Sequence, residues 1–163
     1  MATLTVWKMQ DPKGATVAID KLEQLQKQGL IKIHDAAVVE WEPGKKKPKT
    51  RQLNNLAGAG ALGGAFWGLL FGLIFFIPLL GLAIGAASGA IAGSLTDVGI
   101  DDRFIKQARD RIQPGDSALF LLTSDAVMDK VEAEFDMSKI ELLFTNLSNE
   151  DEERLRAAFG EEE

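Results

Sequence analysis

A histidine and the carboxylate beside it are the first residues of the chain that could do chemistry. His34 is the only histidine, and it directly precedes Asp35. An imidazole held by a carboxylate can act as a general base, because its pKa lies near neutral pH. The chain has no cysteine, and no serine with a second orienting group accompanies the pair. We therefore interpret His34 as a polar strand position and predict no catalytic residues and no enzymatic activity.

Three aspartates form a second group with possible chemistry. Asp97, Asp101 and Asp102 follow a long apolar block, and hard cations favour such oxygen ligands. The alternating ligand pattern of a calcium loop is absent, so we interpret Asp101 or Asp102 as the cap of the next helix and Asp97 as a boundary residue. We predict no metal and no cofactor.

Glycine recurs at every fourth position in two runs of the apolar block, which carries no charge from Gln52 through Thr96. The runs lack both the closing GK[ST] of a phosphate loop and the context of a dinucleotide-binding turn. Glycines four residues apart lie along one helix face and let a second backbone approach closely. We assign helix packing and homo-oligomerisation to eight of them: Gly60, Gly64, Gly68, Gly72, Gly81, Gly85, Gly89 and Gly93.

The same block predicts a glycine-zipper helical hairpin that enters a membrane. A helix needs about 20 apolar residues to cross the hydrocarbon core. Residues 56–76 supply that length, whereas residues 80–96 are slightly short. Pro78 marks the turn, because proline breaks a helix interior. The turn has no polar residue, so a spanning hairpin, a re-entrant hairpin and a hairpin buried within an oligomer all remain open.

A basic cluster precedes the hairpin and bears on its orientation. Basic residues beside a membrane segment favour the cytoplasmic side and attract anionic lipid headgroups. The formal net charge of -6 argues against general nucleic-acid binding. Since the start of the chain also lacks the features of a signal peptide, we expect the inner membrane, with the polar part facing the cytoplasm. The cluster consists of Lys45, Lys46, Lys47, Lys49 and Arg51.

The polar flanks predict an α+β fold. Apolar periodicity predicts strands at residues 3–9, 30–41, 48–53, 117–123 and 139–145, and helices near residues 11–29, 100–112, 124–135 and after 148. The first six elements follow the strand and helix order of a ferredoxin-like βαββαβ domain. The predicted organisation is therefore a first half at residues 1–53, the membrane hairpin at 54–97 and a second half at 98–163 with an acidic last helix.

Four segments carry a resemblance to a known family. They are residues 34–39 (HDAAVV), 67–76 (WGLLFGLIFF), 99–105 (GIDDRFI) and 114–120 (PGDSALF). In these segments the chain resembles a bacterial family of uncharacterised membrane proteins, the domain of unknown function 1269 family. The resemblance extends from the first strand to Leu143 and implies a membrane-associated protein with a glycine-zipper hairpin. The lysine-rich residues 45–49 depart from the family pattern, which leaves the length of that turn open.

These observations predict an oligomeric membrane protein that acts as a scaffold or stress-related membrane organiser. Its expected partners are further copies of itself and membrane lipids, with no nucleic acid and no small-molecule substrate. One alternative is a pore- or channel-forming transport protein, although an uncharged hairpin offers little to an ion pathway. The other is a soluble oligomer that buries the hairpins in its core.

Overall fold

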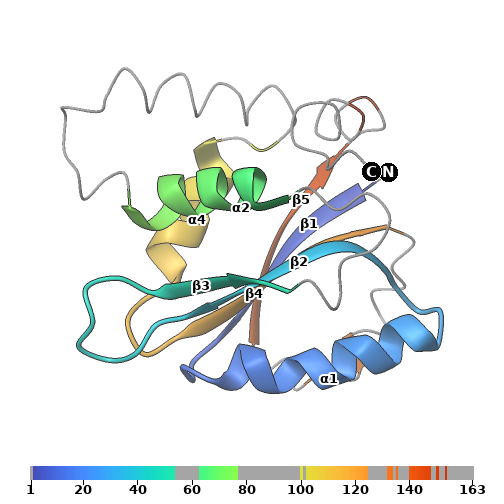
Figure 1. Ribbon diagram of the computed structural model, residues 1–163, viewed down its shortest axis with the longest axis horizontal. Coiled ribbons are helices and arrows are strands. Elements are labelled where there is room, and N and C mark those ends of the chain that lie inside the picture. Colours follow the sequence, from blue (N-terminus) through green and yellow to red (C-terminus); the bar gives the residue numbers. More distant parts are fainter. Residues whose placement is uncertain are drawn as a thin grey trace.

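The computed structural model describes residues 2–53, 63–76, 100, 102–124, 132–133, 135, 140–147, 150 and 153. Within these residues the chain forms an α+β fold around a five-stranded antiparallel sheet (Figure 1). The strands are β1 (Ala2–Met9), β2 (Lys32–Glu40), β3 (Lys49–Gln52), β4 (Ser117–Ser124) and β5 (Ile140–Leu147). The helices are α1 (Gly14–Lys27), α2 (Gly63–Phe71), the π-helix η1 (Gly72–Phe76) and α4 (Asp102–Arg111).

The five predicted strands are confirmed, but their order in the sheet is not the predicted one. A ferredoxin-like domain with the predicted elements would place residues 48–53 between the first two strands and residues 117–123 at an edge. The observed order is β3-β2-β4-β1-β5, so β4 lies between β1 and β2 while β3 is at the edge. The physical reason is hydropathy, because SALFLLTS can be buried on both faces and KTRQ cannot.

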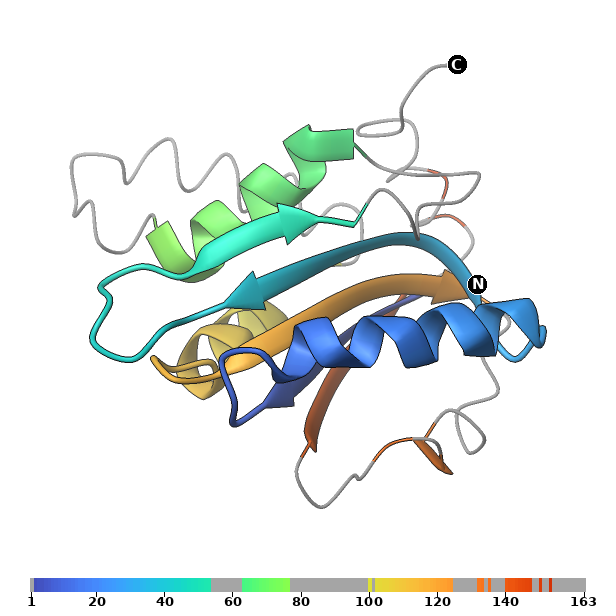
Figure 2. The same ribbon diagram turned by 60° about the horizontal axis from the view of Figure 1, so that its bottom comes forward.

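Helices cover both faces of the sheet. Helix α1 lies against one face, and α2, η1 and α4 lie against the other (Figures 1 and 2). Successive strand residues point to opposite faces, so β1, β2 and β4 each contribute to both apolar layers. The α1 layer includes Trp7, Val38, Leu119 and Leu121, whereas the α2 layer includes Leu4, Val6, Val39, Phe120 and Leu122.

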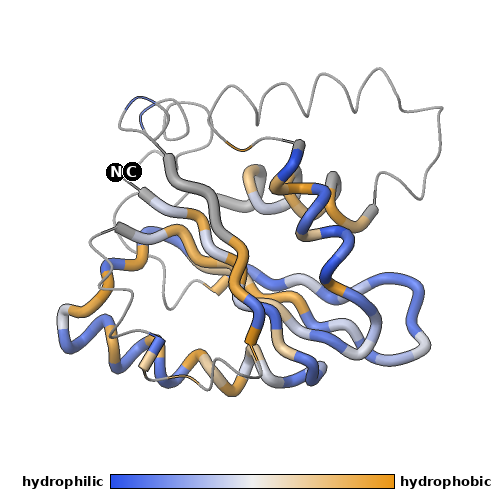
Figure 3. The backbone as a smooth tube through the Cα atoms, turned by 180° about the vertical axis from the view of Figure 1, so that it is seen from behind, coloured by the Kyte–Doolittle hydropathy of each residue, from blue (hydrophilic) through white to orange (hydrophobic). Residues whose placement is uncertain are grey.

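Helix α1 has the predicted amphipathic pattern. The Asp11 carboxylate accepts the Lys13 amide at 2.9 Å in the turn before the helix, which begins at Gly14. Hydrophilic and hydrophobic residues alternate along it in Figure 3, and Ala15, Ala18, Leu22 and Leu25 are buried. Gly29, with φ of 75°, follows the end of the helix in the left-handed conformation that glycine adopts without strain.

Residues 63–76 form part of the cover over the second face of the sheet. Phe71 of α2 lies edge-on to Phe120 of β4 with ring centroids 5.0 Å apart. The Arg109 side chain of α4 donates a hydrogen bond to the Ile74 carbonyl at 3.4 Å. The sequence predicts a membrane-spanning helix over residues 56–76, whereas in the structure residues 63–76 of that stretch pack on the sheet. Its buried side chains are Phe66, Trp67, Leu70, Phe71, Ile74 and Phe75.

None of the helices that the structure describes combines the length and hydropathy that a membrane span requires. Residues 54–62 and 77–99 lie outside the described part of the chain. The glycine-zipper hairpin and the domain division at residues 54–97 therefore stay predictions. Most of the predicted helix at 124–135 and of the last helix also lies outside that part.

We expect Phe120→Ala to lower the free energy of unfolding by about 3–5 kcal/mol, because the truncation opens a cavity beneath Trp67 and Phe71. Urea denaturation followed by circular dichroism would measure the loss. Val17→Ala is the matched control, since Val17 is 73% exposed, and it should change stability by less than about 0.5 kcal/mol. Equal stability of the Phe120 variant and the parent would contradict the described packing.

Candidate functional site

A fully buried carboxylate, Asp35, lies at an irregularity of β2. The β2–β4 register shifts between Ile33 and Asp35, so His34 is the extra residue of a bulge. The Trp67 indole Nε1 of α2 donates to Asp35 Oδ2 at 2.9 Å. The Ala36 amide donates to Oδ1 at 2.9 Å, and Gln52 Nε2 of β3 lies 3.4 Å from both carboxylate oxygens. Asp35 thus joins β2, β3 and α2.

This geometry suits attachment of a helix better than proton transfer. A general base needs an oxygen or nitrogen within reach of a substrate proton, whereas both oxygens of Asp35 already accept hydrogen bonds. Asp35 is 0% exposed and His34 is 3% exposed. A buried carboxylate requires such donors, because transfer of an unpaired charge out of water is very unfavourable. We call the contact between Asp35 and Trp67 the indole–carboxylate latch.

The sequence predicts His34 as a polar strand position beside Asp35, and both residues do lie on β2. It does not reveal Trp67 and Gln52 as partners of Asp35, since they follow it by 32 and 17 positions. One signal could have indicated them. An acidic residue within an apolar strand needs buried donors, and tryptophan is the one large apolar side chain that supplies an N–H group.

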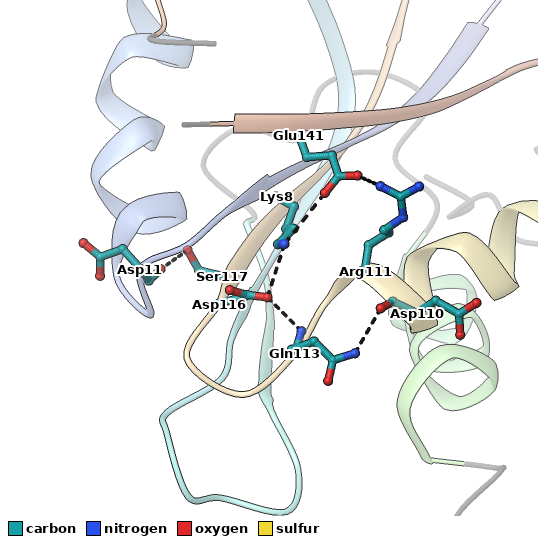
Figure 4. A network of polar contacts seen from close by, with 8 residues as sticks. All are labelled: Lys8, Asp11, Asp110, Arg111, Gln113, Asp116, Ser117 and Glu141. Atoms are coloured by element: carbon teal, nitrogen blue, oxygen red, sulfur yellow. Dashed lines mark hydrogen bonds and ion pairs between the residues drawn. The ribbon is translucent and has the colours of Figure 1, made fainter. Parts of the chain in front are cut away.

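A second group of polar side chains lies at the end of the sheet where α4 meets β4 (Figure 4). Lys8 Nζ of β1 is 3.6 Å from Asp116 Oδ2 and 3.7 Å from Glu141 Oε2. Arg111 forms an ion pair with Glu141, and Asp116 also accepts the Gln113 amide at 2.9 Å. The network joins β1 and β5 to the turn between α4 and β4, which is a structural role.

Lys13 bridges two glutamates close to the end of β2. Its Nζ lies 2.8 Å from Glu40 and 3.7 Å from Glu42. The hydrogen bond and the charge of Glu40 raise the pKa of Lys13. A raised lysine pKa stabilises the fold below the ordinary lysine pKa, and this contribution is lost as the pH rises through the folded-state value. Since the Lys13 side chain is 64% exposed, solvent screening keeps the contribution small.

Only one of the three aspartates singled out in the sequence lies among the described residues. Asp97 and Asp101 lie outside them, and Asp102 is the first residue of α4. Among the described residues, no group of three or more His, Asp or Glu side chains could hold a metal ion.

Three of the eight predicted packing glycines lie in α2 and η1. Gly68 is exposed, and a Cβ placed on it would have no described heavy atom within 4 Å. Gly72 is partly exposed in η1, and Gly64 lies in the first turn of α2. The side of the segment that carries Gly68 and Gly72 faces away from the buried aromatic side. The other five glycines, Gly60, Gly81, Gly85, Gly89 and Gly93, lie outside the described residues.

The predicted basic cluster occupies the hairpin between β2 and β3, which we call the basic hairpin (residues 43–51). Lys45, Lys46, Lys47, Lys49 and Arg51 are all exposed. The Trp41 indole donates to the Lys45 carbonyl at 2.9 Å and lies edge-on to Phe75 with centroids 5.8 Å apart. The basic hairpin is therefore attached beside the end of η1. Its loop is hydrophilic over much of its length in Figure 3.

A family model described as "Protein of unknown function (DUF1269)" matches residues 61–160. The chain belongs to the DUF1269 family. The DUF1269 match includes α2, η1, α4, β4 and β5, while the strands β1 to β3 precede it. No curated protein and no solved structure matches the chain. Membership in DUF1269 thus confirms the resemblance seen in the sequence and assigns no activity.

We expect Trp67→Phe to lower the free energy of unfolding by about 1–3 kcal/mol, because it removes one donor from a buried carboxylate while it keeps an aromatic ring. Urea titration would measure the change. Trp41→Phe removes a solvent-exposed indole hydrogen bond from a half-buried ring, so this control should cost less than about 1 kcal/mol. Similar losses in the two variants would contradict a special role for the latch.

Proposed function

We propose that this DUF1269 protein is a self-associating, membrane-associated scaffold without enzymatic activity. The observation that carries the proposal is the outward glycine side of α2 and η1. The segment uses its aromatic side to bind its own sheet, and Gly68 on the other side is exposed with open space at its Cβ position. Close helix contacts form where small residues let backbones approach. The glycine side is thus suited to a helix of a second copy.

The membrane part of the proposal is based on the uncharged residues 77–96. Insertion of residues 63–76 themselves would break the latch between Trp67 and Asp35 and expose the α2 side of the sheet to water. We therefore keep α2 and η1 on the sheet and assign lipid contact to the residues that follow η1. A hairpin embedded in one leaflet fits this assignment better than one that uses residues 56–76 as a span.

A ferredoxin-like arrangement is part of the proposal. The order β2-β4-β1-β5, antiparallel between neighbours, and the helix α1 between β1 and β2 support it. In that arrangement β4 is the strand inserted into a split βαβ unit. Strand β3, α2, η1 and α4 are then an insertion between the second and third strands of the core.

A soluble or peripheral oligomer is the second candidate function class. It is favoured by the burial of six apolar side chains of residues 63–76 against the sheet, because this burial needs no lipid. The pore alternative has no comparable support, since nothing charged or polar is available in residues 63–76 to line an ion pathway.

We expect Gly68→Leu to reduce chemically crosslinked oligomers at least tenfold while it preserves the fold, because the added side chain meets open space within its own chain and blocks backbone approach by a second helix. Crosslinking in native membranes and in mild detergent would measure it. Gln107→Leu, which adds the same side chain at an exposed position of α4, should leave crosslinking unchanged. Monomers alone in the parent protein would exclude the self-association.

Cell fractionation separates the two candidate classes. Retention of the parent protein in the membrane after carbonate treatment, with release by detergent, is the result that the membrane-associated scaffold requires. Recovery of an oligomer in the soluble fraction would instead favour the second candidate. Gly68→Leu should leave fractionation unchanged, since its effect is on helix contacts between copies.

A further inference from the structure

We propose that the basic hairpin is a binding site for anionic phospholipid headgroups at a bilayer surface. The inference rests on the membrane association in the proposed function and names the lipid class and the residues that recognise it. Five cationic side chains, Lys45, Lys46, Lys47, Lys49 and Arg51, are exposed on one short hairpin. Clustered basic residues attract anionic lipid within a short distance of the surface.

The carboxylates near the base of the basic hairpin are already paired with other cations. Glu40 and Glu42 lie within ion-pair distance of Lys13. On the neighbouring turn between α4 and β4, Asp116 pairs with Lys8, which also pairs with Glu141 on the far edge strand β5 (Figure 4). These carboxylates therefore already have cationic partners outside the hairpin. A chain with a net charge of -6 thus presents a local surface of the opposite sign.

Backbone hydrogen bonds hold the base of the hairpin in place. The Trp41 amide donates to the Asp116 carbonyl at 3.0 Å, and the Gly115 amide donates to the Trp41 carbonyl at 2.6 Å. The indole of Trp41 in turn holds the Lys45 carbonyl. Gly44, with φ of 81°, permits the turn itself. The lysines are thus carried by a turn with a fixed base.

The position of the hairpin favours a lipid surface over a nucleic acid. Trp41 contacts Phe75 at the end of η1, and the chain then continues from Phe76 into residues 77–96, which carry no charge. The exposed cations therefore lie beside the point where the described chain leads into an uncharged apolar segment, an arrangement that suits the headgroup and acyl layers of a bilayer. The acidic remainder of the chain would repel a long polyanion that extends beyond the hairpin. At a flat bilayer surface, acidic groups more than about 8 Å away are screened at physiological salt and so oppose binding less.

Vesicle cosedimentation of the full chain tests the inference. One set of vesicles contains phosphatidylcholine alone, and the other contains phosphatidylcholine mixed with phosphatidylglycerol. The test variant is Lys45→Gln, Lys46→Gln and Lys47→Gln together. The matched control is Lys27→Gln, Lys32→Gln and Lys106→Gln together, three exposed lysines on α1, β2 and α4. Both variants change the net charge equally, and circular dichroism checks their folds.

We expect the parent protein to bind the anionic vesicles more tightly than the phosphatidylcholine vesicles. At low salt, the affinity of the test variant for anionic vesicles should fall about fivefold per lysine, or on the order of 100-fold in total. The control variant should retain most of the binding. Equal losses in both variants would overturn the inference, because they would show an effect of net charge alone.

Two other outcomes separate this inference from the proposed function. Equal binding to both vesicle types would overturn the hairpin site while membrane association survives. Absence of binding to either type would overturn both the site and the membrane part of the proposed function. Tighter hairpin-dependent binding to a duplex oligonucleotide than to anionic vesicles at equal salt would also overturn the inference in favour of a nucleic acid.

Discussion

The central strand β4 is apolar on both faces, and the rest of the structure depends on covering both. Leu119 and Leu121 point to the α1 layer, whereas Phe120 and Leu122 point to the α2 layer. Each apolar side chain removed from water contributes about 1.5–3 kcal/mol, so an uncovered face would be strongly unfavourable. Helix α1 covers the first face. The second face requires α2, η1 and α4, and this requirement draws residues 63–76 into the fold.

The indole–carboxylate latch fixes how α2 is oriented on the sheet. Hydrophobic burial is nearly independent of orientation, so on its own it would let α2 slide or rotate on the sheet. Asp35 accepts one indole N–H at 2.9 Å, and a shift of one helical position would leave a buried carboxylate without that donor. The bulge at His34 is what turns Asp35 toward α2. This one polar contact therefore defines the position of the apolar helix α2 on the sheet.

Local patterns in the sequence predict the strands and the two amphipathic helices well. The alternation in VWKM and the stripe from Ala15 to Leu25 depend on neighbours in the chain, so one sequence suffices to detect them. The observed strand order differs from the predicted one, because the pairing of β4 with β1 and β2 joins segments far apart in the chain.

The position of residues 63–76 was missed for a different reason. An apolar helix that carries no charge has the same composition whether it faces lipid or the apolar face of a sheet. The two environments differ only because the apolar sheet face that carries Phe120 must be covered by a helix. This requirement can be recognised only once β4 is known to be the central strand. The partners of Asp35 were missed for the same reason, since Trp67 reaches it only after α2 has been placed.

The position of β3 at the edge has a consequence for how copies of the protein can assemble. An edge strand with free amides and carbonyls can recruit the strand of another chain, and lysines at such an edge oppose that pairing by repulsion between like charges. Strand β3 is short, and Lys49, Thr50 and Arg51 are exposed on it. Continuation of the sheet from one copy into the next is therefore disfavoured at this edge. Its charges therefore protect this edge of the sheet against open-ended fibre growth.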